Sequence, residues 1–261
     1  MAAAKANAPV KVSGGLKALV NMRGEDWVVN HVEAWALRDN KPRIDPGWFH
    51  PSSLSHSCDA YLAFQYLGLA PRSDNVAPQT LRIFDNGHNR DEAWKRYLKA
   101  SGLSMVTPGN PCAGCGARNR DGRHICFPDL RIRGDFDDHI RNPITGRTYI
   151  FEFKTKNEYL WTKLKEPDPE HIIQIHPYMA AKGEKETVVM YENKNTQQLK
   201  PFVVGFNEST WNGIRERVLR IRNQLENGWA PTRTPDSFET KCDFYDRCGS
   251  FDFSTALLMP D

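Results

Sequence analysis

Residues 130–137 read LRIRGDFD and residues 148–155 read TYIFEFKT, with the turn signals Asn142-Pro143 and Thr145-Gly146 between them. In both stretches apolar and charged residues alternate, which is typical of β-strands. Because side chains two apart on a strand share a face, Glu152 and Lys154 lie together. If the two strands pair as a hairpin, Asp135 approaches Glu152.

The flanking segments predict helices and further strands. Upstream, helical spacing is found over 16–39, 54–69 and 79–100, with Phe84 and His88 expected on the inward face of the third segment. Downstream, helices are expected over 169–182 and 208–227, and strands over 186–192 and 201–206. This order predicts an α/β fold with a mixed central sheet flanked by helices.

The length of 261 residues suits one large domain. We predict a flexible N-terminal arm over 1–15, a single domain over 16–250 with a cysteine-rich insert at 107–128, and a C-terminal tail over 251–261. Hydrophobic and charged fractions of 39% and 26% exclude a wholly disordered chain. The formal net charge of +3 is compatible with a nucleic-acid partner but does not demand one.

The sequence predicts an intracellular protein. No stretch approaches eighteen uninterrupted apolar residues, and residues 1–15 lack the apolar segment of a secretory signal. We therefore expect a reducing compartment, the cytoplasm of a bacterial or phage-infected cell. In such a compartment cysteines bind metals more often than they form disulfides.

The pair Asp135 and Glu152 is the first candidate for chemistry. Two close carboxylates repel each other, and such an arrangement persists most easily around divalent cations. The acid-x-Lys pattern alone selects nothing, because it occurs four times, at Asp39–Lys41, Glu152–Lys154, Glu192–Lys194 and Glu239–Lys241. From the hairpin alone, a metal site and an ordinary charged strand surface both remain open.

Two further features accompany the hairpin, and together they form an ordered set of motifs. The set is Gly87-His88, Gly134-Asp135-Phe136-Asp137, Glu152-Phe153-Lys154 and Gln174-Ile175-His176-Pro177-Tyr178. It resembles the RecB-like branch of the PD-(D/E)XK nuclease superfamily, which includes the exonucleases of CRISPR adaptation and phage recombination nucleases. The resemblance covers roughly residues 50–250 and implies a restriction-endonuclease-like core.

The resemblance also implies a metal centre. Asp135 and Glu152, with the backbone carbonyl of Phe153, would hold Mg²⁺ or Mn²⁺, and His88 would help to hold this or a neighbouring ion. These ligands, the imidazole apart, are the hard oxygens that such ions prefer. Asp137 is assigned a supporting or structural role behind them.

The remaining catalytic roles follow from the same resemblance. Lys154 would orient the attacking water or stabilise the charge that builds on the phosphate. Gln174 and Tyr178, four apart on one helix face, would fix Lys154 or contact the DNA backbone. His171 and His176 are interpreted as packing or surface residues rather than ligands.

The insert contains a candidate zinc site. Cys112 and Cys115 form a Cys-x-x-Cys pair, and His124 with Cys126 would complete a tetrahedral set. Such a loop has too few apolar residues to fold alone, so a bound metal would supply its stability.

The other three cysteines, Cys58, Cys242 and Cys248, form a second candidate site. Many RecB-like nucleases bind a [4Fe–4S] cluster through one cysteine before the core and three after it. Here Glu239 stands where the further cysteine is expected, so the set is one ligand short. The alternatives are a non-cysteine fourth ligand, a second zinc site with a histidine such as His56, or a decayed site. In each case the tail would fold back onto the helix bearing Cys58.

Arginines supply candidate DNA contacts around the hairpin and along the last helix, at Arg131, Arg133, Arg141, Arg147, Arg215, Arg217, Arg220 and Arg222. For the last helix an ordinary solvated flank is the preferred interpretation. Because no base-reading motif is present, we expect sequence-independent contact with the DNA backbone.

The leading functional prediction is a Mg²⁺- or Mn²⁺-dependent DNA exonuclease of recombination, repair or replication, with a phage or mobile element as one source. Two alternatives stay open. The same centre would also serve an endonuclease on branched or single-stranded DNA, and a nuclease-like DNA-binding or assembly module would use the fold without catalysis. Such a module has no need of the carboxylates and the lysine.

Overall fold

The computed structural model describes residues 27–42, 44–71, 76–119, 121–234 and 242–258. The predicted arm at 1–15 and the first part of the helix predicted from residue 16 lie outside this range. Contacts divide the chain into two units, one of residues 1–41 and 76–84 and one of residues 42–75 and 85–261. No helix among the described residues is long and apolar enough to cross a bilayer.

The described residues form helices at both ends of the chain and strands and helices between them. The α-helices are α2 (Trp27–Asp39), α3 (Asp59–Tyr66), α4 (Pro78–Ala100), α5 (Glu158–Lys163), α6 (Pro169–Lys182), α7 (Glu208–Glu226) and α8 (Tyr245–Cys248). Short 3₁₀ turns are η1 (Pro51–Ser53), η2 (Pro128–Leu130) and η4 (Phe253–Leu258). The strands are β1 (His124–Phe127), β2 (Ile132–Asp135), β3 (Asp138–Arg141), β4 (Thr148–Lys156), β5 (Glu186–Asn193) and β6 (Leu199–Gly205).

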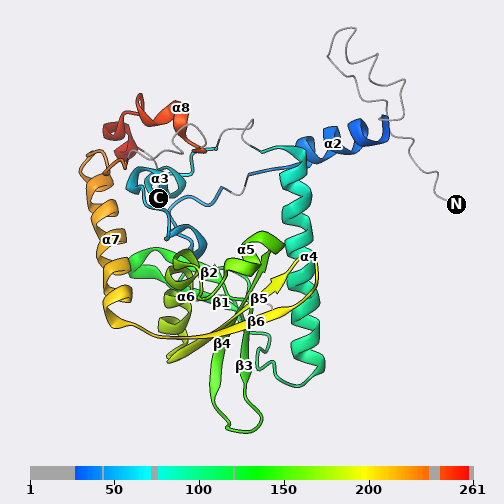
Figure 1. Ribbon diagram of the computed structural model, residues 1–261. Helices are drawn as coiled ribbons and strands as arrows, with labels where there is room; N and C mark the ends of the chain where they lie inside the picture. Colours follow the sequence, from blue (N-terminus) through cyan, green and yellow to red (C-terminus); the bar gives the residue numbers. More distant parts are fainter. Residues whose placement is uncertain (1–26, 43, 72–75, 120, 235–241, 259–261) are drawn as a thin grey trace, which may run out of the picture. The chain divides into compact units, whose positions relative to one another are not determined.

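A mixed four-stranded sheet forms the centre of the second unit, in the order β3-β4-β5-β6. β4 and β5 are parallel and are joined through α5 and α6, while the two outer pairs are antiparallel. β1 and β2 form a separate antiparallel ribbon. The predicted α/β class, with a mixed sheet flanked by helices, is confirmed (Figure 1).

The two faces of β4 pack against different helices. Phe151 and Phe153 form one apolar cluster with Trp94 and Leu98, from the C-terminal half of α4. Ile150, on the opposite face, belongs to the main core, whose members include residues of α3, α6 and α7. Glu152 stands two residues after Ile150 on β4, so the two side chains share a face of the sheet. The Glu152 carboxylate is therefore buried toward α6.

An ion pair fixes α4 to the sheet. Glu192 on β5 is buried and accepts two hydrogen bonds from Arg90, at 2.7 and 2.5 Å, and a third from the indole of Trp94 at 3.0 Å. A buried carboxylate without its cation is strongly unfavourable. Glu192 is one of the four acids in the acid-x-Lys pattern, and its contacts with α4 give it a structural role.

Replacing Arg90 with Leu is expected to lower the free energy of unfolding by about 3–5 kcal/mol, because it leaves the buried Glu192 carboxylate without its cation. Urea denaturation measures the loss. The double variant Arg90→Leu/Glu192→Leu should recover most of it. Arg82→Leu, which breaks an exposed pair with Glu33, should cost less than about 1 kcal/mol. Equal losses at the two arginines would contradict the assignment.

The predicted hairpin is wrong in its pairing. Residues 130–137 do not form one strand: β2 ends at Asp135 and pairs with β1, and β3 begins at Asp138 and pairs with β4. The register therefore places Asp135 opposite His124 rather than beside Glu152. The cause is β1, a strand at the end of the cysteine-rich insert, which takes the edge of β2.

Two predicted helices also differ. The segment 54–69 becomes helical only at Asp59, because Pro51–Ser53 form a 3₁₀ turn, so Cys58 is the N-cap residue of α3. Phe84 on α4 is 53% exposed rather than inward-facing.

Candidate active site

Glu152 is the most deeply buried acid of the predicted centre. Its side chain is 2% exposed, and Oε1 accepts hydrogen bonds from Lys154 Nζ at 2.7 Å and Gln174 Nε2 at 2.8 Å. Burial disfavours the Lys154 ammonium, but Glu152 and Asp137 outweigh it and raise the Lys154 pKa. Tyr178 follows Gln174 by one turn, with the two side chains 3.4 Å apart.

Asp137 is the carboxylate that lies near Glu152. It follows β2, and its Oδ2 accepts a hydrogen bond from the backbone N–H of Phe153 at 2.7 Å. Burial, then the Glu152 charge, then that of Asp91 raise its pKa well above the usual range. Asp137, in the β2–β3 connection, thus lies close enough to Glu152 on β4 and Asp91 on α4 for both charges to act on it.

These acids fit a divalent cation. Glu152 Oε2 and Asp91 Oδ1 are both buried and have no hydrogen-bond partner among the described residues. A buried carboxylate oxygen without a partner is costly, and two of them beside a third acid would be relieved by a cation with oxygen-ligand preference. The donor set therefore suits Mg²⁺ or Mn²⁺.

A cavity of about 570 Å³ opens at this cluster. Its lining includes Asp91, Asp137, Gln174 and Tyr178, together with Gly134, at which a Cβ would lie only 2.8 Å from Pro51 Cδ. Glycine at this position therefore allows η1 to approach the strand closely.

Two of the predicted ligands lie at the periphery of the cluster. His88 is exposed and lines the cavity one turn before Asp91. Asp135 also lines it, but its side chain is 62% exposed and its Oδ1 lies 2.9 Å from His124 Nδ1. The close approach of Asp135 to Glu152, expected from the hairpin, is replaced by that of Asp137.

Asp91 was missed by the sequence reasoning. It stands three residues after His88, and the two share a helix face. That spacing was the available signal, but it gains meaning only where α4 passes the β2–β3 connection. Its Oδ2 pairs with Lys95 at 2.7 Å, which holds the carboxylate in place.

The cysteine loop brings three of the four predicted zinc ligands together. One ligand atom each from Cys112, Cys115 and His124 lies within 4.8 Å of the others, and His124 Nε2 is 3.2 Å from Cys115 Sγ. Burial and the neighbouring Cys115 and Cys112 thiols raise the pKa of Cys126 to about 12, so its sulfur faces the same group. A Cβ at Gly114 would meet Cys126 Sγ at 3.3 Å.

The second cysteine set behaves differently. Cys58 is buried in the main core, and Cys242 and Cys248 pack against it. These three do not form a metal-ligand group among the described residues, and Glu239 lies outside that range. An iron–sulfur cluster or a second zinc at these three cysteines stays a prediction.

The tail does fold onto the helix that follows Cys58. Phe244, Phe251 and Phe253 contact Phe64, with ring centroids 5.3–5.4 Å apart. The contact predicted between the tail and this helix is therefore present, and it is aromatic.

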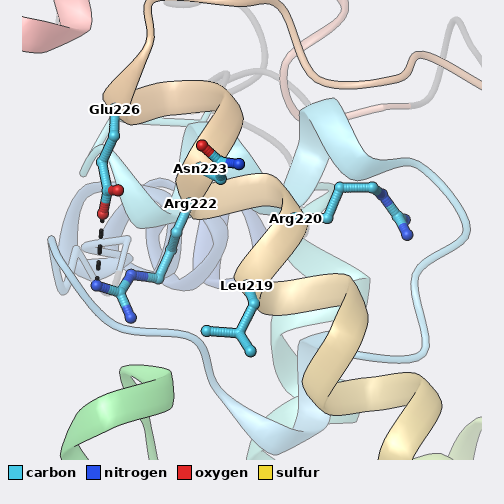
Figure 2. Close-up of a pocket in the computed structure, with 5 residues that line it drawn as sticks. All are labelled: Leu219, Arg220, Arg222, Asn223 and Glu226. Atoms are coloured by element: carbon cyan, nitrogen blue, oxygen red, sulfur yellow. Dashed lines mark hydrogen bonds and ion pairs between the residues drawn. The ribbon is translucent and has the colours of Figure 1, made fainter.

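Most of the candidate DNA-binding arginines are engaged within the fold. On α7, Arg217 and Arg220 both bind Asp59, at 2.7 and 2.9 Å, and Arg222 donates to the Asp129 carbonyl at 2.6 Å. Figure 2 shows Arg222 reaching toward Glu226, while Arg220 extends outward from the other side of the helix. The hollow of about 470 Å³ that these side chains line on α7 is thus formed by structural arginines.

The arginines before the hairpin are engaged too. Arg131 and Arg133 lie over the ring of Trp48, and Arg133 also pairs with Asp45. Arg147, in the turn between β3 and β4, is 67% exposed and pairs with Glu186 at 3.7 Å.

The two remaining histidines of α6 have structural partners. His176 is buried, with Nδ1 2.6 Å from the Ile172 carbonyl and Nε2 accepting from the Asn207 N–H. His171 Nδ1 lies 2.7 Å from the Tyr191 hydroxyl. Burial, followed by the Lys154 charge, lowers the pKa of His171 to about 3.

That shift predicts acid sensitivity. A histidine whose folded pKa is lowered stabilises the fold above its unfolded pKa of 6.5, and this stability is lost as the pH falls toward 3. Between pH 6.5 and 4.5 the loss should be about 2–3 kcal/mol. Urea denaturation at several pH values measures it. His171→Gln should flatten the slope, whereas His31→Gln on the exposed α2 should not.

Comparison with known proteins finds distant structural similarity. No protein-family model and no curated protein matches the chain. Among solved structures, the crystal structure of SSO0001 is 14% identical, with 85% of this chain and 96% of that chain covered and a TM-score of 0.46. An alkaline exonuclease from Laribacter hongkongensis, LHK-Exo, is 16% identical over 76% and 93% of the chains, with a TM-score of 0.47. The structure of LHK-Exo in complex with dAMP is 19% identical, again with 76% of this chain and 93% of that chain covered, and its TM-score is 0.46.

Proposed function

We propose that this protein is a DNA nuclease that uses Mg²⁺ or Mn²⁺, held by Asp91, Asp137 and Glu152 with the carbonyl of Phe153. The observation that carries the proposal is the buried Glu152, whose Oε2 has no partner among the described residues while Asp137 and Asp91 lie close by. Asp137 takes the place expected for Asp135. A cation held there supplies a nucleophilic water at neutral pH and a counter-charge for the leaving oxygen.

The neighbouring side chains have separate tasks in this proposal. Lys154, charged because Glu152 and Asp137 raise its pKa, stabilises the negative charge that builds on the phosphate. Gln174 holds Glu152 Oε1 and so directs Oε2 into the site. Tyr178 and the exposed His88 line the cavity where the DNA backbone would enter.

The arrangement of acid, acid and lysine supports a place in the PD-(D/E)XK superfamily, with the RecB-like branch as the finer assignment. Exonuclease action in recombination, repair or replication remains the leading form of the activity. The proposal includes a structural zinc ion at Cys112, Cys115, His124 and Cys126, and it is supported by the first three, whose ligand atoms lie within 4.8 Å of one another.

The test compares end-labelled linear DNA with covalently closed single- and double-stranded circles, each with Mg²⁺, with Mn²⁺ and without either ion. We expect progressive loss of the linear DNA only, with the labelled end reporting the polarity. Cleaved circles would favour the endonuclease. Absence of metal-dependent cleavage on every substrate would overturn the nuclease and favour a DNA-binding module.

A further inference from the structure

We propose that Asp135 supports the zinc ligand His124, and that the zinc-held loop 107–128 forms the wall of the nuclease cavity that presents Arg118 to DNA phosphates. The inference deepens the proposed function by assigning one aspartate of the GDFD motif and part of the DNA contact to the cysteine loop.

The position of His124 is the first argument. Its two ring nitrogens face different partners, with Nε2 3.2 Å from Cys115 Sγ and Nδ1 2.9 Å from Asp135 Oδ1. A histidine that binds a metal usually donates its other N–H to a carboxylate, which fixes the tautomer and the ring. Asp135 therefore leaves the Nε2 lone pair directed at the three thiols.

The contrast between Asp135 and Asp137 is the second argument. The strand ladder pairs Asp135 with His124, whereas Asp137 accepts from the backbone of Phe153 beside Glu152. Between them Phe136 is buried, 1% exposed, against Tyr178. One tetrapeptide thus links the loop on one side to the acid cluster on the other.

The lining of the cavity is the third argument. The loop supplies Arg118, Asp121 and Arg123 to the same cavity of about 570 Å³ that Asp91 and Asp137 line. Arg118 also lines a neighbouring cavity of about 240 Å³ with Cys115 and His124. Arg118 therefore lines both the cavity beside the zinc ligands and the cavity beside Asp91 and Asp137.

Arg118 and Arg123 have different environments. The Arg123 side chain is 13% exposed and engaged by Asp121 and Asp138. Arg118 is exposed and has no ion pair within the part of the chain that the structure describes. A guanidinium in that position can bind a phosphate through two parallel N–H···O hydrogen bonds, in a bidentate arrangement.

The zinc half is tested without DNA. Wild-type protein is loaded with Zn²⁺, and metal content and transfer to a chromogenic chelator are measured. Asp135→Ala should weaken zinc binding about 10–100-fold. Asp137→Asn is the matched control and should keep zinc like the wild type while losing cleavage. Failure of the wild type to bind zinc, or zinc binding by Asp135→Ala equal to wild type, would overturn the proposal.

The DNA half is tested by binding of a labelled duplex without added Mg²⁺ or Mn²⁺. Arg118→Ala should raise the Kd about ten-fold at low salt and reduce the salt slope by about one, with zinc content unchanged. Arg247→Ala, at an exposed arginine of α8 that lines neither cavity, is the control and should bind like the wild type. Unchanged binding by Arg118→Ala would overturn this half.

The two sets of results separate this inference from the proposed function. Zinc binding and DNA binding are measured without cleavage. An inactive wild type would therefore overturn the nuclease proposal, while the zinc-binding and DNA-binding results would still test this inference. Loss of cleavage in Asp135→Ala with zinc binding intact would instead return Asp135 to the catalytic cation.

Discussion

Replacing Glu152 with Gln is expected to reduce Mg²⁺-dependent DNA cleavage about a thousand-fold, since a loss of ~4 kcal/mol of metal-assisted stabilisation corresponds to that factor. Gln keeps the shape and can still accept from Lys154 and Gln174, but it lacks the charge that binds the cation. Initial rates on linear DNA measure the effect.

The same variant should leave the fold intact. Glu152 raises the pKa of Asp137, so the two carboxylates oppose each other when no cation is present. Removing one charge should keep or raise the Tm of the metal-free protein and abolish the rise that Mg²⁺ produces in the wild type. Glu226→Gln, at an acid that is 65% exposed on α7, is the control. Normal cleavage by Glu152→Gln would place the active site elsewhere.

Replacing Cys115 with Ser is expected to release zinc and to destabilise the chain by on the order of 3 kcal/mol, about a quarter of the roughly 10–16 kcal/mol that a structural zinc supplies. The loop depends on the metal because its residues 107–119 contain no strand or helix and none of these thirteen residues is buried. Metal analysis and urea denaturation measure the two effects.

Cys248→Ser is the matched control for that variant. Cys248 packs at the edge of the main core and belongs to no metal-ligand group of the described residues, so the zinc content should stay at the wild-type level. Equal zinc loss from both variants would point to general unfolding, and unchanged zinc in Cys115→Ser would remove the zinc loop.

Local pattern determined much of this protein. The period-two alternation of 148–155 places Glu152 and Lys154 on one face, and the four-residue step places Gln174 and Tyr178 on one side of α6. The structure agrees, with Lys154 and Gln174 both bonded to Glu152. The Cys-x-x-Cys spacing likewise brought Cys112 and Cys115 together. Such relations depend on backbone geometry over a few residues.

The choice among equivalent residues depended on the tertiary structure. Asp135 and Asp137 have the same chemistry and parity in the sequence, and only the pairing of β2 with β1 assigns the first to His124 and leaves the second to Phe153. Asp91 joined the acids because α4 packs on the sheet, and Arg217 left the candidate DNA surface because Asp59 lies beneath it. These contacts join residues far apart in the chain, and strand pairing and helix packing, which no local period encodes, decide them.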